Sequence, residues 1–121
     1  MKKRILIIDD SMFVRTIISE AIVASGCEVV GQAGTGKEGI ALALELKPDL
    51  ITLDNILPDM IGLDILKTLK SEEKLASKII MISAVGQESV TQQGLALGAE
   101  DYIRKPFDID QMLASIKKAL G

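Results

Sequence analysis

The chain has 121 residues, a net charge of −3 and no histidine; apolar residues make up 48% of it and aromatic residues only 2%. This length suits one domain, and the apolar content predicts a packed aliphatic core rather than a disordered chain. The acidic balance argues against a nucleic-acid surface, the missing histidines exclude histidine-based catalysis and most zinc sites, and the single cysteine excludes an internal disulfide.

The first part of the chain predicts strands and helices in alternation. Ile5–Ile8 is a short apolar run, typical of a strand that is buried on both faces. Apolar residues then recur at helical spacing until Gly26, which ends the predicted helix. A second strand is predicted over Glu28–Ala33, and a second helix over Gly36–Leu46 that ends at Lys47-Pro48.

The remainder continues this alternation. Three further strands are predicted, at Leu50–Leu53, Ile79–Ile82 and Asp101–Arg104. Three further helices are predicted, from Leu63 to about Leu75, over Ser89–Leu97, and from a capping Asp108 to Leu120. Five strand–helix units in strict alternation predict an α/β fold, a doubly wound parallel sheet with helices on both faces.

Polar side chains follow four of the five predicted strands. Asp9 and Asp10 come after the first strand, Asp54 after the third, Ser83 after the fourth and Lys105 after the fifth. Parallel strands end at the same edge of a sheet, which is where such sheets bind ligands. We therefore expect three carboxylates, a hydroxyl and an ammonium group to converge at this edge.

Such a cluster predicts a magnesium and phosphoryl site. Adjacent carboxylates repel each other, whereas Mg²⁺ prefers carboxylate and phosphate oxygens as ligands. Asp54 could accept a phosphoryl group as an aspartyl-phosphate, while Lys105 pairs with an anion and Ser83 hydrogen-bonds a phosphoryl oxygen. Taken singly, each residue is better explained as a polar strand end, and Asp10 or Ser11 as a helix cap. Their joint placement favours a site.

The sequence resembles the receiver domains of two-component response regulators, most closely the single-domain chemotaxis receivers. The matching segments are "IDDSMFVR", "LITLDNILPDMIGLDIL", "IIMISA", "LGAEDYIRKPF" and the final helix. The resemblance covers essentially the whole chain, so one receiver domain is expected over residues 1–121. It implies a flavodoxin-like sheet with strand order 2-1-3-4-5.

The resemblance also assigns the metal site. It implies that Asp54 is the phosphoacceptor and that Asp10 binds Mg²⁺ directly, with Asp9 assisting through water. Asp54 itself and the main-chain carbonyl of Ile56 would complete the protein's share of the metal shell. Lys105 would contact the phosphoryl group, and its bond to Pro106 would be cis.

Three further residues resemble the family's switch. Ser83 would move to bind the phosphoryl group, Tyr102 would swing inward when it does, and the small Ala84 would leave room for that swing. Phosphorylation adds nearly two negative charges and so biases a two-state loop and surface. The protein is therefore expected to be a signalling switch that promotes its own phosphorylation, and not an enzyme acting on a separate substrate.

Some positions depart from the family pattern. Ile56 and Val85 stand where polar residues often flank the path of a hydrolytic water, so slow self-dephosphorylation is predicted. Ile61 replaces an acid that usually precedes Gly62, a loop position to which we attach little weight.

"GQAGTGKE", Gly31 to Glu38, matches the first part of a nucleotide-binding P-loop. The next residue should be Ser or Thr, to hold Mg²⁺, but here it is the anionic Glu38. The preceding strand is also the second one, away from the acidic cluster. A glycine-rich loop that leads into a helix is the preferred interpretation.

Two other function classes remain open. A haloacid-dehalogenase-type phosphohydrolase also uses a strand-end Asp with Mg²⁺, but it needs a second Asp where Ile56 stands and a cap domain for which the chain has no room. An inactive receiver acting as an interaction module is disfavoured by the intact acidic cluster, Ser83 and Lys105.

The expected partners follow from the resemblance. A chemotaxis histidine kinase would donate the phosphoryl group, and a flagellar motor switch protein would bind the fourth helix, fifth strand and fifth helix, where Tyr102 lies. A sporulation-type phosphorelay is the alternative, and the chain is either a stand-alone receiver or a piece of a longer regulator. A phosphatase is a possible further partner. The chain has no apolar run long enough to span a bilayer, so a cytoplasmic monomer without nucleic-acid or membrane contacts is expected.

Overall fold

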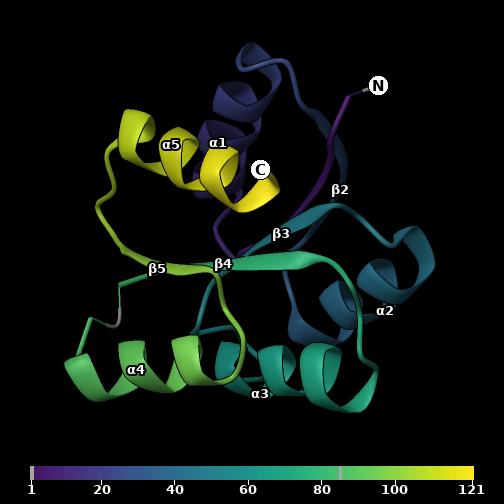
Figure 1. Cartoon of the computed structure of the whole chain (residues 1–121), viewed down its shortest axis with the longest axis vertical. Helices are drawn as coiled ribbons and strands as arrows, with labels where there is room; N and C mark the ends of the chain where they lie inside the picture. Colours follow the sequence, from purple (N-terminus) through teal and green to yellow (C-terminus); the bar gives the residue numbers. More distant parts are fainter. Residues whose placement is uncertain (1, 85) are drawn as a thin grey trace.

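The computed structural model describes residues 2–84 and 86–121, and it places one parallel sheet between two layers of helices (Figure 1). The strands are β1 (Arg4–Ile8), β2 (Glu28–Ala33), β3 (Leu50–Leu53), β4 (Lys78–Ser83) and β5 (Asp101–Arg104). The helices are α1 (Met12–Ala24), α2 (Gly36–Leu46), α3 (Gly62–Lys67), which continues as the π-helix η1 (Thr68–Glu72), α4 (Glu88–Ala96) and α5 (Ile109–Leu120). The predicted α/β class is confirmed.

The strands lie side by side in the order β2-β1-β3-β4-β5, and all neighbouring pairs are parallel. This is the order that the resemblance implied. At the carboxyl end of the sheet, Ile8 of β1 pairs with Ala33 of β2 and with Leu53 of β3. The residues that follow β1 and β3 therefore start from the same level of the sheet.

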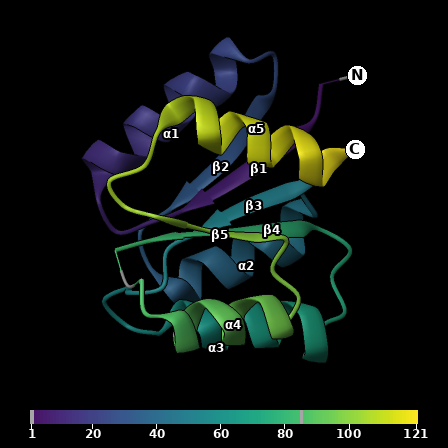
Figure 2. The ribbon, with the colours of Figure 1, turned by 60° about the vertical axis from the view of Figure 1, so that its left-hand side comes forward.

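Each face of the sheet is covered by its own helix layer (Figure 2). Ile5 and Ile7 of β1 belong to the core under α1 and α5, whereas Leu6 and Ile8 belong to the core under α2, α3 and α4. Successive strand residues point to opposite faces, so a strand covered on both sides is apolar throughout. Among the described residues, no helix is long and apolar enough to cross a membrane.

Local capping explains where α1 and α5 begin. The Ser11 hydroxyl accepts a hydrogen bond from the Val14 N–H at 3.2 Å, so Ser11 rather than Asp10 caps α1. Asp108 caps α5 as predicted, because its carboxylate accepts from the Asp110 N–H at 2.8 Å. The caps leave Asp9 and Asp10 outside the helix, at the edge of the sheet.

The third helix is shorter than predicted. The sequence pattern indicated a helix to about Leu75, but the helix ends at Glu72 and its last turn is a π-turn. The Glu73 N–H donates to the Thr68 carbonyl at 2.8 Å, which widens the turn, and Lys74 then adopts a left-handed φ of 53°. The Leu75 N–H still reaches back to Leu69 at 2.8 Å. Leu75 keeps its apolar contacts without being helical.

Candidate functional site

Three carboxylates meet at the carboxyl edge of the sheet. One oxygen each of Asp9, Asp10 and Asp54 can be chosen so that all lie within 4.8 Å of one another. Asp9 is 1% and Asp54 6% exposed, whereas Asp10 is open to solvent. The predicted convergence of these side chains is confirmed, and the two that are buried need a positive partner.

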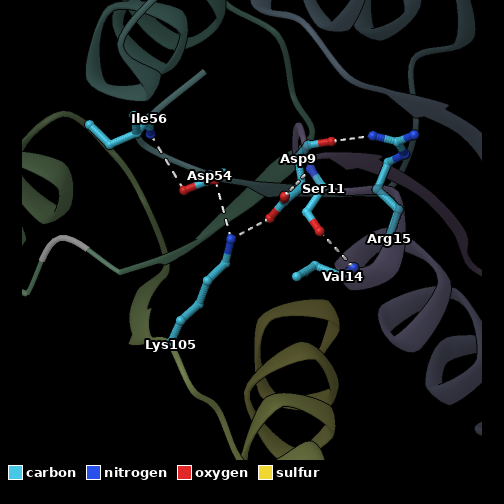
Figure 3. A network of polar contacts seen from close by, with 7 residues as sticks. All are labelled: Asp9, Ser11, Val14, Arg15, Asp54, Ile56 and Lys105. Carbon is cyan, nitrogen blue, oxygen red and sulfur yellow. Dashed lines mark hydrogen bonds and ion pairs between the residues drawn. The ribbon is translucent and has the colours of Figure 1, made fainter. Parts of the chain in front are cut away.

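Lys105 is that partner. Its Nζ donates to Asp9 Oδ2 at 2.6 Å and to Asp54 Oδ2 at 3.2 Å (Figure 3). Burial alone would lower the pKa of Lys105, but the hydrogen bond to Asp9 and the charge of Asp54 outweigh it and raise that pKa. Burial raises the pKa of Asp9, and Lys105 offsets only part of this rise. The Lys105–Pro106 bond is cis, as predicted.

The turn that carries Asp9 is fixed from both sides. Its side-chain Oδ1 accepts from the Ser11 N–H at 2.9 Å, and its main-chain carbonyl accepts from Arg15 Nη1 at 2.6 Å (Figure 3). The Asp9 N–H donates to the Ala33 carbonyl at 3.0 Å. Arg15 ends the matching segment "IDDSMFVR", but no role was predicted for it from the sequence; its place one turn into the helix after Asp9 is the signal that could have suggested one.

The loop between β3 and α3 forms a small hairpin next to Asp54. Ile56 and Ile61 form an isolated antiparallel bridge, and both side chains are half exposed. Two hydrogen bonds flank the bridge, from Gly62 N–H to the Asn55 carbonyl at 2.6 Å and from Leu57 N–H to the Met60 carbonyl at 3.2 Å. Neither bond uses the carbonyl of Ile56. The Ile56 N–H donates to Asp54 Oδ1 at 3.4 Å, so this residue lies beside the acidic cluster.

Ser83 and Tyr102 also lie together. Ser83 is fully buried at the end of β4, and its carbonyl accepts from the Lys105 N–H at 3.0 Å. Tyr102 is 9% exposed, and burial raises the pKa of its hydroxyl, an effect that its hydrogen bond with Ser83 partly offsets. Gly94 of α4 lines the ring, since a Cβ there would lie 3.3 Å from Tyr102 Cδ2. No sequence signal had indicated Gly94.

Two further positions named from the sequence, Ala84 and Val85, follow Ser83 along the chain. Ala84 is exposed next to Ser83, and its expected role in making room for Tyr102 stays a prediction. Val85, named above as an apolar neighbour of the hydrolytic path, lies outside the described residues.

The glycine-rich segment, Gly31 to Glu38, joins the end of β2 to the start of α2, in agreement with the interpretation preferred from the sequence. It leads into α2, whose first residue is Gly36 and whose cap is Thr35. The first two N–H groups of α2 are bound by the carboxylate of Asp59. An internal anion therefore occupies the place that a phosphate takes in a P-loop.

The donor set fits a small hard cation. Mg²⁺ takes oxygen ligands and uses one or two carboxylates, with water and phosphate oxygens completing its shell. Asp9, Asp10 and Asp54 supply carboxylate oxygens within 4.8 Å of one another, and Ile56 adjoins them with a carbonyl that its hairpin does not use. The exposed Asp10 leaves one side of this set open to solvent.

Comparisons with known proteins agree with this geometry. A family model described as the response regulator receiver domain matches residues 5–117. The Chemotaxis protein CheY of Bacillus subtilis is 42% identical over 121 residues, covering all of both chains. The Chemotaxis protein CheY of Thermotoga maritima is 38% identical over 118 residues, covering 98% of each.

Solved structures show the same fold. The response regulator domain of Thermotoga maritima CheB superposes with a TM-score of 0.91 at 32% identity, covering 99% of this chain and 97% of that one. A chain of the CheX-CheY-BeF3-Mg+2 complex from Borrelia burgdorferi gives a TM-score of 0.93 at 28% identity, covering 98% and 90%.

Proposed function

The chain belongs to the response regulator receiver domain family, and we propose that it is a chemotaxis switch activated by phosphorylation of Asp54. The observation that carries this proposal is the set of Asp9, Asp10 and Asp54 gathered around Lys105 at the carboxyl edge of the sheet. The proposed domain spans residues 1–121, of which the family model matches 5–117.

The chemistry is a transfer between two nucleophiles. A carboxylate oxygen of Asp54 forms a bond to phosphorus while the bond from phosphorus to the kinase histidine nitrogen breaks, and the imidazole keeps that electron pair. Mg²⁺, held by Asp9, Asp10, Asp54 and the Ile56 carbonyl, would offset negative charge on the phosphoryl oxygens. Lys105 already reaches Asp54 at 3.2 Å, so its ammonium group can pair with a phosphoryl oxygen there.

Phosphorylation changes the charge balance that holds the site. The phosphoryl group carries nearly two negative charges and three acceptor oxygens. Lys105 then has a stronger anion to pair with than Asp9, and the Ser83 hydroxyl has a hydrogen-bond partner besides Tyr102. Because Ser83 and Tyr102 lie on β4 and β5, we propose that this rearrangement is transmitted to the surface formed by α4, β5 and α5.

The partners are proposed by similarity. Relatives at 42% and 38% identity bear the name Chemotaxis protein CheY, which supports a chemotaxis histidine kinase as donor and a flagellar motor switch protein as target. This role places the protein in the cytoplasm as a monomer, with a phosphatase as a further partner. A sporulation-type phosphorelay is the alternative output.

A phosphohydrolase of the haloacid-dehalogenase type is disfavoured at the site itself. Its second carboxylate would have to stand at Ile56, which is apolar and 54% exposed. The aliphatic side chain of Ile56 cannot donate a proton to a leaving group, as that second carboxyl group would.

The test is the intact mass of the protein after incubation with a small acyl-phosphate donor, with and without Mg²⁺. We expect a gain of one phosphoryl group that requires both Mg²⁺ and Asp54, so that Asp54→Asn shows none. If the unaltered protein gains nothing under any condition, the chain is an inactive interaction module.

The output is tested separately. Phosphorylated protein should bind a peptide from a flagellar motor switch protein more tightly than unphosphorylated protein does. Equal affinities would contradict the proposal that the protein signals to the flagellar motor. A partner can favour the phosphorylated state only if it binds that state more tightly than the unphosphorylated one.

A further inference from the structure

The N-terminus of α2 holds a side chain from another part of the chain. Asp59 Oδ1 accepts from the Gly36 N–H at 2.7 Å, and Asp59 Oδ2 accepts from the Lys37 N–H at 3.0 Å. The first N–H groups of a helix have no partner within the helix and carry its positive dipole end. One carboxylate therefore satisfies two of them at once, and it comes from the tip of the β3–α3 loop, residues 55–61.

The packing of this loop depends on a glycine in α2. A Cβ on Gly36 would lie 2.7 Å from Met60 Sδ and 2.9 Å from Met60 Cβ. Gly36 is buried, so the loop tip sits directly on the first turn of the helix. This close approach gives Gly36, the last glycine of the P-loop-like segment, a structural reason that has nothing to do with nucleotides.

The same end of α2 also touches β1. A Cβ on Gly39 would lie 2.7 Å from Ile8 Cδ1, and Ile8 immediately precedes Asp9. Two chain segments that carry the proposed metal ligands, the end of β1 and the β3–α3 loop, thus both rest on the first turn of α2. A shift of that turn would move one segment relative to the other.

Asp59 ties the tip of the loop to this support. The base of the loop is fixed by the bond from Gly62 N–H to the Asn55 carbonyl at 2.6 Å, and Leu57 and Met60 bond within the loop. Asp59 connects the loop to a different element, 23 residues away along the chain. Between the base and the tip lies Ile56, whose N–H contacts Asp54 Oδ1.

We propose that Asp59 is a positioning residue for phosphoryl transfer: by binding the N-terminus of α2 it holds the β3–α3 loop so that Ile56 stays beside the Asp9–Asp10–Asp54 cluster. This inference rests on the proposed phosphorylation of Asp54 and names a residue outside the cluster that supports it. Residues that orient metal ligands commonly change metal affinity or activity by tenfold or more when they are replaced.

The experiment compares Asp59→Ala with a matched control at the same helix end. The hydroxyl of Thr35 accepts from the Glu38 N–H at 3.2 Å, so Thr35→Ala also removes a cap of α2 but leaves the loop contact intact. Both variants should lose stability in urea unfolding, because each removes an acceptor from the N-terminus of α2. Only Asp59→Ala should loosen the loop.

Three readouts separate positioning from capping. We expect Asp59→Ala to weaken Mg²⁺ binding in calorimetry about tenfold, to raise the Mg²⁺ concentration for half-maximal phosphorylation by a similar factor, and to speed amide exchange at Ile56 and Leu57. Thr35→Ala should stay within about twofold of the unaltered protein in Mg²⁺ affinity, far below the effect expected of a group that orients a ligand. Asp59→Asn keeps one acceptor oxygen, so its Mg²⁺ affinity should lie between those of Asp59→Ala and Thr35→Ala. If Asp59→Ala does not fold, the comparison is made with Asp59→Asn.

The outcomes for this inference and for the proposed function are distinct. If Asp54 is phosphorylated but Asp59→Ala and Asp59→Asn match Thr35→Ala in Mg²⁺ affinity and loop exchange, the positioning role is wrong and the proposed function stands. If the unaltered protein is never phosphorylated, the proposed function fails, and the calorimetry and exchange measurements still decide whether Asp59 holds the loop.

Discussion

Gly62 lies directly against the backbone of Asp54. A Cβ on Gly62 would come within 2.3 Å of the Asp54 carbonyl oxygen and 2.7 Å of the Asn55 Cα, distances that atoms do not adopt. The first residue of α3 therefore packs on the main chain of Asp54, the proposed phosphoacceptor. Any side chain at this position would push the start of α3 away from the main chain of Asp54 and Asn55.

Replacing Gly62 should slow phosphorylation, an effect that a replacement which only lowers stability should not have. We expect Gly62→Ala to cost about 1–3 kcal/mol of unfolding free energy by overpacking, and to slow phosphorylation at a fixed Mg²⁺ concentration because Asp54 moves. Gly26→Ala is the control: nothing lies within 4 Å of its Cβ, but its φ of 94° makes alanine strained. Gly26→Ala should lower stability and leave the phosphorylation rate unchanged, and equal rates in both variants would contradict the prediction.

Removing the cation from the acidic cluster should destabilise the metal-free protein. Lys105→Met leaves Asp9 and Asp54 buried together without a counter-charge. We expect a loss of about 2 kcal/mol at neutral pH, below the usual cost of breaking a fully buried pair because the Lys105 side chain is 19% exposed. Urea unfolding measures it. Lys78→Met, which removes an exposed pair with Glu100 at 3.6 Å, should cost well under about 1 kcal/mol; a similar loss in both variants would show that Lys105 is not needed as a counter-charge.

Magnesium should stabilise the folded protein through Asp10. Binding to the folded state alone adds RT ln(1 + [Mg²⁺]/Kd), which is about 2.7 kcal/mol at one hundred times the dissociation constant. Asp10→Asn should remove most of this gain in urea unfolding at matched ionic strength. Because Asp10 is exposed, the replacement should change the metal-free stability little. Glu20→Gln, an exposed acid on α1, should keep the full gain, and a loss there would indicate general screening instead of a site.

The apolar Ile56 should make the phosphorylated form long-lived. Its side chain is 54% exposed beside Asp54 and offers no hydrogen bond to a hydrolytic water. We expect Ile56→Asn to speed loss of the phosphoryl group about tenfold, less than a full general base would provide. The decay is followed by intact mass after the donor is removed. Ile61→Asn, at the bridge partner, should leave the decay unchanged, and rapid decay of the unaltered protein would refute the idea.

Acid should remove the stabilisation that Asp59 provides. Hydrogen bonds from the Gly36 and Lys37 N–H groups lower the pKa of Asp59 below its ordinary value of 3.8. A carboxyl with a lowered folded pKa stabilises fully above its unfolded pKa and loses that contribution as the pH falls through the folded value. The difference in unfolding free energy between the unaltered protein and Asp59→Asn should be constant at neutral pH and shrink below 3.8. The corresponding difference for Thr35→Ala should not follow this titration, since no titrating group is replaced.

Much of the fold and of the acidic cluster could be predicted from the sequence. The four-residue apolar runs, the helical spacing of apolar residues and the punctuation by Gly26 and Lys47-Pro48 are local signals, and each element they predicted is present. Because all strands are parallel, the residues after them lie at one edge of the sheet, and the strand order that the resemblance implied puts β1 beside β3. Asp9, Asp54 and Lys105 could therefore be placed at the same edge of the sheet from the sequence, without their individual contacts.

The tertiary structure decided what the pattern could not. The ion pair of Lys105 with Asp9 joins residues 96 positions apart, and the hydrogen bond from the Gly36 N–H to Asp59 joins residues 23 positions apart. Local propensity carries no information about such contacts, which exist only once the sheet and its helix layers are packed. The early end of the third helix at Glu72 has the same origin, because apolar spacing continues to Leu75 while a π-turn and a left-handed Lys74 redirect the chain. Sequence pattern fixes which face of an element is buried; packing selects the single arrangement in which distant polar groups also find partners.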